Sequence, residues 1–396
     1  MYTTKIEQQT QVLFFVALSL ALLGTLYRQS FWPGHVSVAK YIALSGLFLV
    51  FFRFLAVLYS MPIKHALLII ALCPFILYTC SRVHDKTYLL YPFLFCISAW
   101  NVNFRTVIKF FFWINLVFFV ITIVSSNLGI IKNYIQERDV LDIVEVVNTG
   151  ENKVRNGFGY LGPTYVGAHL TYLNLMWWYI RRGILKPSDY IILFISIWFA
   201  SHYSDARTDA GCMCVIGLFS IVYKFRLSKK QTIFCLEKFV LSYSIIILAS
   251  LMFFLTYQFL NSSDELYQYI NIIISGRLQL GANAILEKGI PFLGQFYIQQ
   301  GVGTKLMYNF IDCSYLMILI IYGIFTFILT MFVFAIISRR SVVHKEYLLS
   351  LILLIVAIQS FIMPGLLRFS YNPFFMAFLA NIDMKQLYEK ISVVKV

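Results

Sequence analysis

The feature that most constrains this chain is a succession of long apolar runs separated by short polar stretches. A helix that crosses roughly 30 Å of hydrocarbon needs about 20 residues, and an α-helix or a closed barrel is the only backbone that a bilayer tolerates. The predicted spans lie near 11–27, 38–59, 62–80, 87–103, 106–130, 158–180, 187–202, 208–223, 235–260, 311–338, 346–364 and 371–384. We therefore predict an all-α, polytopic integral membrane helical bundle of about 12 transmembrane helices, which forms a single membrane domain over residues 1–396.

The composition agrees with a membrane environment. Hydrophobic residues make up 60% of the 396 residues and charged residues only 13%, whereas soluble proteins have roughly 45–50% and about 25%. The formal net charge is +14, but the charges form short clusters between apolar runs, as in the cytoplasmic loops of membrane proteins. We predict membrane lipid as a partner and no nucleic acid.

The positions of the basic clusters predict the orientation of the chain. Cytoplasmic loops carry an excess of lysine and arginine. The strongest clusters lie within 181–186, 224–230, 339–345 and the tail 385–395. With twelve spans these clusters share one side, so we expect both termini in the cytoplasm and long outward loops near 131–157 and 261–310. Long loops in a compact protein are most often functional or disordered.

The outward loop 261–310 has a helical pattern. Polar residues recur at spacings of three or four: Asp264, Gln268, Asn271, Ser275, Gln279, Asn283 and Glu287. Apolar residues fill much of the rest, which predicts an amphipathic helix at the membrane interface and hence a partly helical loop. Arg277 lies off the polar stripe and requires an anion. Lipid phosphate, reached by snorkelling, and a bound substrate both remain open.

Ionisable residues beside spans are candidates for function because a membrane makes them costly. One candidate group begins at Arg155 and continues through Tyr160 and Tyr165 to His169. Arginine and tyrosine at the entrance of a span can hold a phosphate at headgroup level. The structural alternative is a simple turn.

A second group is the polar segment 202–209, with Asp205, Arg207 and Asp209 between two apolar runs. The structural alternative is an ion pair between Arg207 and one of the two aspartates. Asp312 and Tyr315 form a weaker candidate at the start of the next span. A Walker loop, a dinucleotide fingerprint, an HExxH motif and a nucleophile elbow are all absent from the sequence, so we predict neither a cofactor nor a metal.

The order of these motifs resembles that of a known family. Arg155 to Tyr165 is followed by Asp-Ala-Arg-Thr at 205–208 and by Ser-Gly-Arg at 275–277, and then by Asp312, Tyr315 and the Tyr-Gly pair at 322–323. This series resembles the Wzy-type polysaccharide polymerases of bacterial capsule, exopolysaccharide and O-antigen clusters, which form a superfamily with the O-antigen ligases. The motifs cover 155–323. The chain departs from the pattern at 162–164, Gly-Pro-Thr where many relatives have His-Pro-Asn, and at Ala206, where many have serine.

The resemblance implies an enzyme at the outer face of the bacterial cytoplasmic (inner) membrane. Its substrate would be an oligosaccharide repeat unit on undecaprenyl diphosphate, and its partners would include a flippase and a chain-length regulator of the same pathway. A hydroxyl of one unit attacks the anomeric carbon of the growing chain, and undecaprenyl diphosphate leaves. On this hypothesis Arg155, Arg207 and Arg277 clamp the diphosphates without a metal. The base candidates are Asp205, Asp209 and His169, and the substrate-binding candidates are Tyr160, Tyr165, Asp312 and Tyr315.

Other classes of membrane protein compete with this interpretation. A ligase usually has an essential histidine in its long outward loop, but 261–310 contains no histidine. A transporter or lipid-linked oligosaccharide flippase predicts charges at mid-membrane and a repeat relating the two halves, neither of which is visible. A structural membrane scaffold is the remaining alternative.

Overall fold

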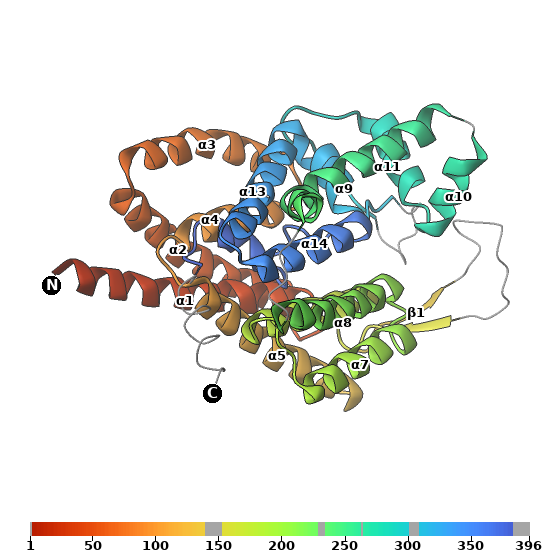
Figure 1. Cartoon of the computed structure of the whole chain (residues 1–396), viewed down its shortest axis with the longest axis horizontal. Coiled ribbons are helices and arrows are strands. Elements are labelled where there is room, and N and C mark those ends of the chain that lie inside the picture. Colours follow the sequence, from red (N-terminus) through yellow and green to blue (C-terminus); the bar gives the residue numbers. More distant parts are fainter. Residues whose placement is uncertain (1, 139–152, 229–233, 263, 301–308, 383–396) are drawn as a thin grey trace.

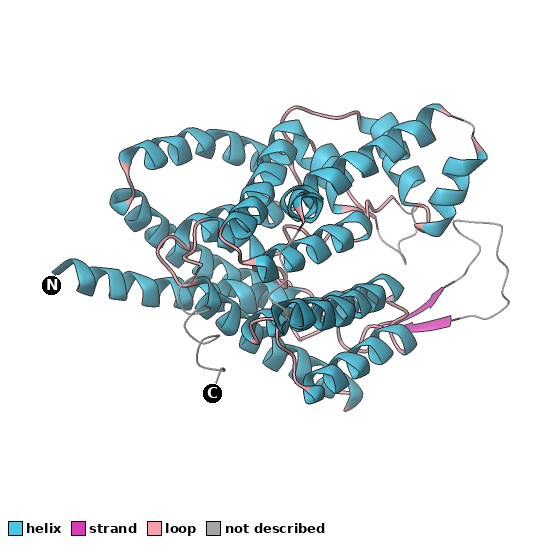
Figure 2. Ribbon diagram, in the orientation of Figure 1, coloured by secondary structure: helices cyan, strands magenta, loops and turns pink. Residues whose placement is uncertain are grey.

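The computed structural model describes residues 2–138, 153–228, 234–262, 264–300 and 309–382. Its helices are α1 (Tyr2–Arg28), α2 (Ser37–Ser60), α3 (Ile63–Arg82), α4 (Thr87–Ser98), α5 (Phe104–Asn127), α6 (Pro163–Ile180), α7 (Pro187–His202), α8 (Arg207–Ser228), α9 (Cys235–Asn261), α10 (Glu265–Ile273), α11 (Arg277–Lys288), α12 (Ser314–Met317), α13 (Gly323–Val343) and α14 (Tyr347–Ile362). A π-helical turn, η2 (Ile318–Tyr322), and a 3₁₀ turn, η3 (Phe374–Phe378), complete them. The strands of the described residues, β1 (Ile135–Arg138) and β2 (Lys153–Asn156), form one antiparallel ribbon (Figure 2). The predicted all-α class is confirmed.

Seven helices of the described part are long and apolar enough to cross a membrane. They are the described part of α1 from Thr10, then α2, α3, α5, α8 to Leu227, α9, and the continuous run from α12 through α13. α4 and α14 are apolar but shorter. In α3 only 22% of the apolar window is buried, and such an exposed apolar surface requires lipid. The chain is therefore a multi-pass membrane protein.

Contacts between distant segments define two ends of the bundle. At the end that we call the basic end, Arg105 donates to the carbonyl of Ile180, and Arg340 donates to that of Phe378 at 3.0 Å. At the opposite end, which we call the loop end, Ser30 pairs with Tyr160. Figure 1 shows the loop end on the right, where β1 and α10 lie.

The basic clusters fall at the basic end, as the sequence predicts. The Arg181–Lys186 turn packs there, since Gly183 contacts the ring of Tyr223 near the end of α8. Arg226 pairs with Glu237 at 2.7 Å at the start of α9. The predicted positions of Lys229, Lys230 and the 385–395 cluster lie outside the described residues.

The twelfth predicted span, 371–384, is wrong as a helix over its described residues, 371–382. After α14 the chain forms a mostly buried, non-helical path over 363–382, interrupted only by η3, which we call the return segment. It begins beside Tyr88 at the loop end and reaches the basic end, where the Asn381 N–H donates to the carbonyl of Val102 at 2.8 Å. Non-helical backbone at membrane depth is tolerated only where protein surrounds it.

The sequence explains why the return segment is not helical. Pro364, Gly365 and Pro373 interrupt it, and proline removes a donor and restricts the residue before it. The side chain of Asn372 then forms hydrogen bonds with backbone groups that lack a helical partner. Its Nδ2 donates to the carbonyl of Leu366 at 2.6 Å, and its Oδ1 accepts from the N–H of Phe374 at 3.0 Å.

Arg53 does not snorkel toward the cytoplasmic interface, although its place near a span end favours that interpretation. Only 5% of its surface is exposed. Its guanidinium donates to the carbonyls of Ser98 at 3.3 Å and Trp100 at 2.9 Å. Arg53 therefore neutralises the carbonyl end of the short helix α4, where the helix dipole is negative.

In the span that contains α12, η2 and α13, the regular α-helix is interrupted near Gly323, in the third of the span nearer the loop end. Gly323 has φ +88°, a conformation that favours glycine. The extended segment 289–296 fills the interruption. The Gln295 side chain donates to the carbonyl of Ile320 at 2.8 Å, and the N–H of Ile324 donates to the carbonyl of Pro291 at 3.0 Å. The backbone groups that the missing helical turn would pair are thereby satisfied.

The long loop 261–310, which the sequence predicts to face outward, is partly helical as predicted, but its described part contains two helices rather than one. The left-handed residues Ser275 (φ 58°) and Gly276 (φ 78°) separate α10 from α11. Asn271 belongs to the predicted polar stripe, yet it is buried. Its Oδ1 accepts the N–H groups of Leu278 at 3.0 Å and Gln279 at 3.2 Å, so it caps α11 instead of facing water.

Candidate functional site

A buried carboxyl joins three helices near the loop end. Asp209 lies in the first turn of α8 and is 1% exposed. Its Oδ1 accepts from Gln359 Nε2 of α14 at 2.6 Å and from Thr171 Oγ1 of α6 at 3.2 Å. The amino-terminal end of a helix favours a negative charge. We call these three residues the carboxyl centre.

Gly167 allows α6 to approach the carboxyl centre. A Cβ on this residue would lie 2.5 Å from Ala206 Cβ and 2.7 Å from Asp209 Oδ2. Both distances are shorter than real Cβ contacts. Oδ2 of Asp209 therefore packs against bare backbone, while Oδ1 accepts the two hydrogen bonds.

Arg155 fixes the turn that precedes α8. Its Nε donates to the carbonyl of Ser204 at 3.2 Å and its Nη2 to that of Asp205 at 3.4 Å. The next residue, Asn156, donates its N–H to the carbonyl of Tyr203 at 2.9 Å. β2 and the α7–α8 turn are thus fastened together, and the charge of Arg155 acts on Asp209.

Arg207 is the exposed arginine of the predicted set. It exposes 66% of its side chain and pairs through Nε with Asp205 Oδ1 at 2.8 Å, whereas the Asp205 side chain is only 8% exposed. Asp205 has φ 45°, and this left-handed turn starts α8 two residues later. Of the two aspartates that the sequence allows as partners of Arg207, the structure pairs it with Asp205.

Arg277 faces the protein. Its Nε donates to the carbonyl of Ile362 at 2.7 Å, and its Nη1 donates to that of Ile274. Ile362 ends α14 one turn after Gln359, which places Arg277 within electrostatic range of Asp209. Its position against α14 argues against snorkelling to a lipid phosphate.

His169, a predicted base, lies in an aromatic core. It is 1% exposed, with its ring centroid 5.1 Å from that of Tyr160 and 5.3 Å from that of Tyr371. Neither ring nitrogen has a hydrogen-bond partner within the described part of the chain. These contacts give His169 a packing role beside the carboxyl centre.

The predicted substrate-binding residues divide into two kinds. Tyr160 and Tyr315 are fully buried, and the Tyr315 hydroxyl donates to the carbonyl of Ala357 at 2.7 Å, which fastens α12 to α14. Tyr165 and Asp312 are half-buried. Tyr165 and Asp312 are therefore partly accessible, whereas Tyr160 and Tyr315 pack between helices.

The sequence analysis did not single out a further cation at the loop end, Arg368. Arg368 lies on the return segment, with Nη1 3.5 Å from Asp85 Oδ2 and its guanidinium carbon 5.1 Å from the centre of the Tyr88 ring. The signal was present, because Arg368 is the only charged residue between Tyr347 and Ile382. An isolated charge in a long apolar stretch is a candidate for function.

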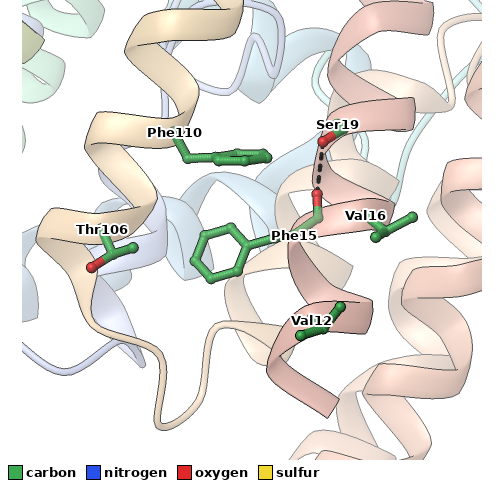
Figure 3. A pocket seen from close by; sticks show the side chains of 6 residues that line it. All are labelled: Val12, Phe15, Val16, Ser19, Thr106 and Phe110. Carbon is green, nitrogen blue, oxygen red and sulfur yellow. Dashed lines mark hydrogen bonds between the residues drawn. The ribbon is translucent and has the colours of Figure 1, made fainter. Parts of the chain in front are cut away.

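The groove shown in Figure 3 does not belong to this site. It lies between α1 and α5 and is lined by Val12, Phe15, Val16, Ser19, Thr106 and Phe110. The Ser19 hydroxyl donates to the carbonyl of Phe15 at 2.9 Å. The groove therefore presents a mainly apolar surface. Gln11, which precedes Val12, donates to the carbonyl of Asn101, which puts the groove near the basic end.

The described residues contain no group of three or more His, Cys, Asp or Glu side chains that could hold a metal ion.

Comparisons with known proteins add no family to this description. No protein-family model matches the chain, and no curated protein and no solved structure matches it either.

Proposed function

We propose that this protein is a membrane polysaccharide polymerase that joins oligosaccharide repeat units carried on undecaprenyl diphosphate at the outer face of the bacterial cytoplasmic membrane. Two observations on the same residues support the proposal. One is the ordered series of motifs that resembles Wzy-type polymerases. The other is the gathering of Arg155, Arg207, Arg277, Asp205 and Asp209 at the loop end of a multi-pass bundle.

The observation that carries the proposal is the pair between the exposed Arg207 and the mostly buried Asp205, four residues or fewer from Asp209 of the buried carboxyl centre. A lipid diphosphate has its charge at headgroup level, where a basic side chain can meet it. Arg207 is the exposed guanidinium of the set, while Arg155 and Arg277 are held by backbone carbonyls. Together they give a positive potential on a rigid frame, which is what a departing diphosphate requires.

The proposed reaction needs no cofactor. The acceptor hydroxyl oxygen forms a bond to the anomeric carbon of the donor chain, and the bond from that carbon to the diphosphate oxygen breaks. The electron pair stays on undecaprenyl diphosphate, where the arginines stabilise it. The proton of the hydroxyl passes to a carboxylate. We assign that step to Asp205, since its carboxylate is paired with the exposed Arg207, whereas Asp209 is enclosed by three helices.

The test is incubation of the purified protein with lipid-linked repeat units, followed by a gel. A ladder of lengths is expected. A single transfer product would indicate a ligase, and unchanged size would favour a transporter or scaffold and overturn the proposal.

Variants connect the reaction to the site. Arg207→Ala is expected to slow ladder formation by about 100-fold, the effect of losing one preorganised charge-stabilising donor. Its stability should fall by about 1–3 kcal/mol at most, because Arg207 is exposed but its removal takes one partner from the mostly buried Asp205 carboxylate. Arg339→Ala, which removes an exposed arginine at the basic end, is the matched control. Normal polymerisation by Arg207→Ala or Arg277→Ala would remove these residues from the mechanism.

A further inference from the structure

Arg368 is a mostly buried cation whose hydrogen-bonding capacity is not filled. A guanidinium has five N–H donors. The side chain is 19% exposed, and its Nε has no hydrogen-bond partner within the described part of the chain. Its anionic neighbour Asp85 stands 3.5 Å away, at the limit of a hydrogen bond. A buried donor left in this way is costly unless a ligand completes it.

Tyrosines surround the guanidinium. The Tyr88 ring lies under it at 5.1 Å, and Tyr165 and Tyr371 are within electrostatic range. Tyr165 is half-buried, so this side of the cluster reaches the surface. A guanidinium on an aromatic face with phenol groups beside it matches the oxygens of a phosphate.

Asp85 can lose its ion pair with Arg368 and still keep its position. Its side chain is 36% exposed. Its position does not depend on Arg368, because the Tyr322 hydroxyl donates to its backbone carbonyl at 2.7 Å and Thr87 donates to Oδ1 at 2.6 Å. The exposed neighbour Lys86 adds positive charge around it.

The cluster adjoins the carboxyl centre but is distinct from it. Tyr371 packs against Tyr172 of α6 with ring centroids 5.0 Å apart. The adjacent residue Thr171 donates to Asp209. Thr171 and Tyr172 of α6 therefore link the carboxyl centre to the tyrosines around Arg368.

From this arrangement we propose that Arg368 binds the diphosphate of a second lipid-linked substrate and that Asp85 is the counter-ion which the diphosphate displaces. The inference rests on the proposed function, since a reaction between two lipid-linked glycans brings two diphosphates to one enzyme. One diphosphate meets Arg207, and the other replaces Asp85 at Arg368.

The experiment measures binding of radiolabelled undecaprenyl diphosphate to the full-length protein in lipid nanodiscs. Arg368→Ala is expected to weaken one of two binding events by at least about tenfold, the effect of one charge-assisted hydrogen bond. Asp85→Asn should strengthen the same event by several-fold, because the competing anion is gone while Tyr322 still donates to the backbone carbonyl and Thr87 can still donate to the side-chain oxygen. Arg339→Ala is the control at the basic end and should bind as the unaltered protein does.

The opposite signs separate a binding site from a structural ion pair. A structural pair predicts that Arg368→Ala and Asp85→Asn both destabilise the protein and that neither strengthens binding, and this result would overturn the proposal. If the alanine variant does not fold, Arg368→Lys replaces it in the test, because lysine keeps the charge. This variant should bind undecaprenyl diphosphate more weakly than the unaltered protein, since lysine lacks the planar set of guanidinium N–H donors.

Competition identifies the source of the phosphate. Inorganic diphosphate should displace the label from the Arg368 event, and phosphatidylglycerol in the nanodisc should not. Equal displacement by phosphatidylglycerol would mean a general lipid-headgroup site and would contradict the inference. If the unaltered protein binds no undecaprenyl diphosphate at all, the proposed function fails as well. If it binds one equivalent that Arg368→Ala leaves unchanged, only the inference fails.

Discussion

Replacing Gln359 by methionine tests how strongly the carboxyl centre holds α6, α8 and α14 together. Methionine keeps the length and most of the volume of glutamine but cannot donate a hydrogen bond. Gln359 and Asp209 are each 1% exposed, so water cannot easily replace the lost donor. The 2.6 Å bond is the shorter of the two that Asp209 Oδ1 accepts.

The magnitude follows from the burial of the acceptor. Removing one partner of a buried hydrogen bond costs about 1–3 kcal/mol, with larger values when the group left behind is charged. We expect Gln359→Met to lower the free energy of unfolding by about 2 kcal/mol. In an Asp209→Asn background the same change should cost less than about 1 kcal/mol, because no buried carboxylate remains to be satisfied. The difference is the coupling energy of the pair.

The assay is SDS-induced unfolding in mixed micelles for the four proteins of this double-mutant cycle. Gln279→Met, which alters an exposed glutamine on α11, is the matched control and should lie within about 0.5 kcal/mol of the unaltered protein. If Gln359→Met costs the same with and without Asp209, the carboxyl centre does not couple these helices and the reasoning is refuted.

Two further predictions concern backbone and surface. Gly323→Ala should destabilise the protein by about 2 kcal/mol or more, since its φ is +88° and a Cβ would lie 2.7 Å from the carbonyl oxygen of Phe292. Gly211→Ala, where no atom lies within 4 Å of the added Cβ, should be neutral or stabilising by up to about 1 kcal/mol; an equal loss in both variants by SDS unfolding would contradict this. Glu237→Gln breaks a bidentate pair with Arg226 at 2.7 and 2.9 Å, but both side chains are about one-third exposed. Its cost should stay below about 1 kcal/mol and shrink further at high salt, and a cost above about 2 kcal/mol would show that the pair is effectively buried.

The sequence predicts most of the helices because apolar length is a local property, although only seven helices of the described residues are long and apolar enough to cross a membrane, fewer than the twelve predicted. Each of the first eleven predicted runs contains a helix. The prediction fails at 371–384, where hydrophobicity comes from burial in protein rather than from contact with lipid. Pro364, Gly365 and Pro373 were available as signals that this apolar stretch is not helical.

The sequence identified the charged residues of the candidate site, but it did not predict which residues they contact. Asp205, Arg207 and Asp209 were recognisable because polar residues stood between apolar runs. The roles of Gln359 and Arg368 depend on neighbours that are distant in sequence, such as Asp209 and Asp85. No periodicity within one segment can reveal such pairs, since they form only when several helices pack together.

The most direct test of the central claim is the length distribution of glycan that the purified protein makes from lipid-linked repeat units when Arg207 or Asp205 is altered. The account predicts a ladder from the unaltered protein and from Arg339→Ala. It predicts loss of the ladder in Arg207→Ala and Asp205→Asn, with both variants folded as judged by SDS unfolding. A full ladder from either of these folded variants, or no ladder from the unaltered protein, would contradict the claim that this site joins lipid-linked glycans.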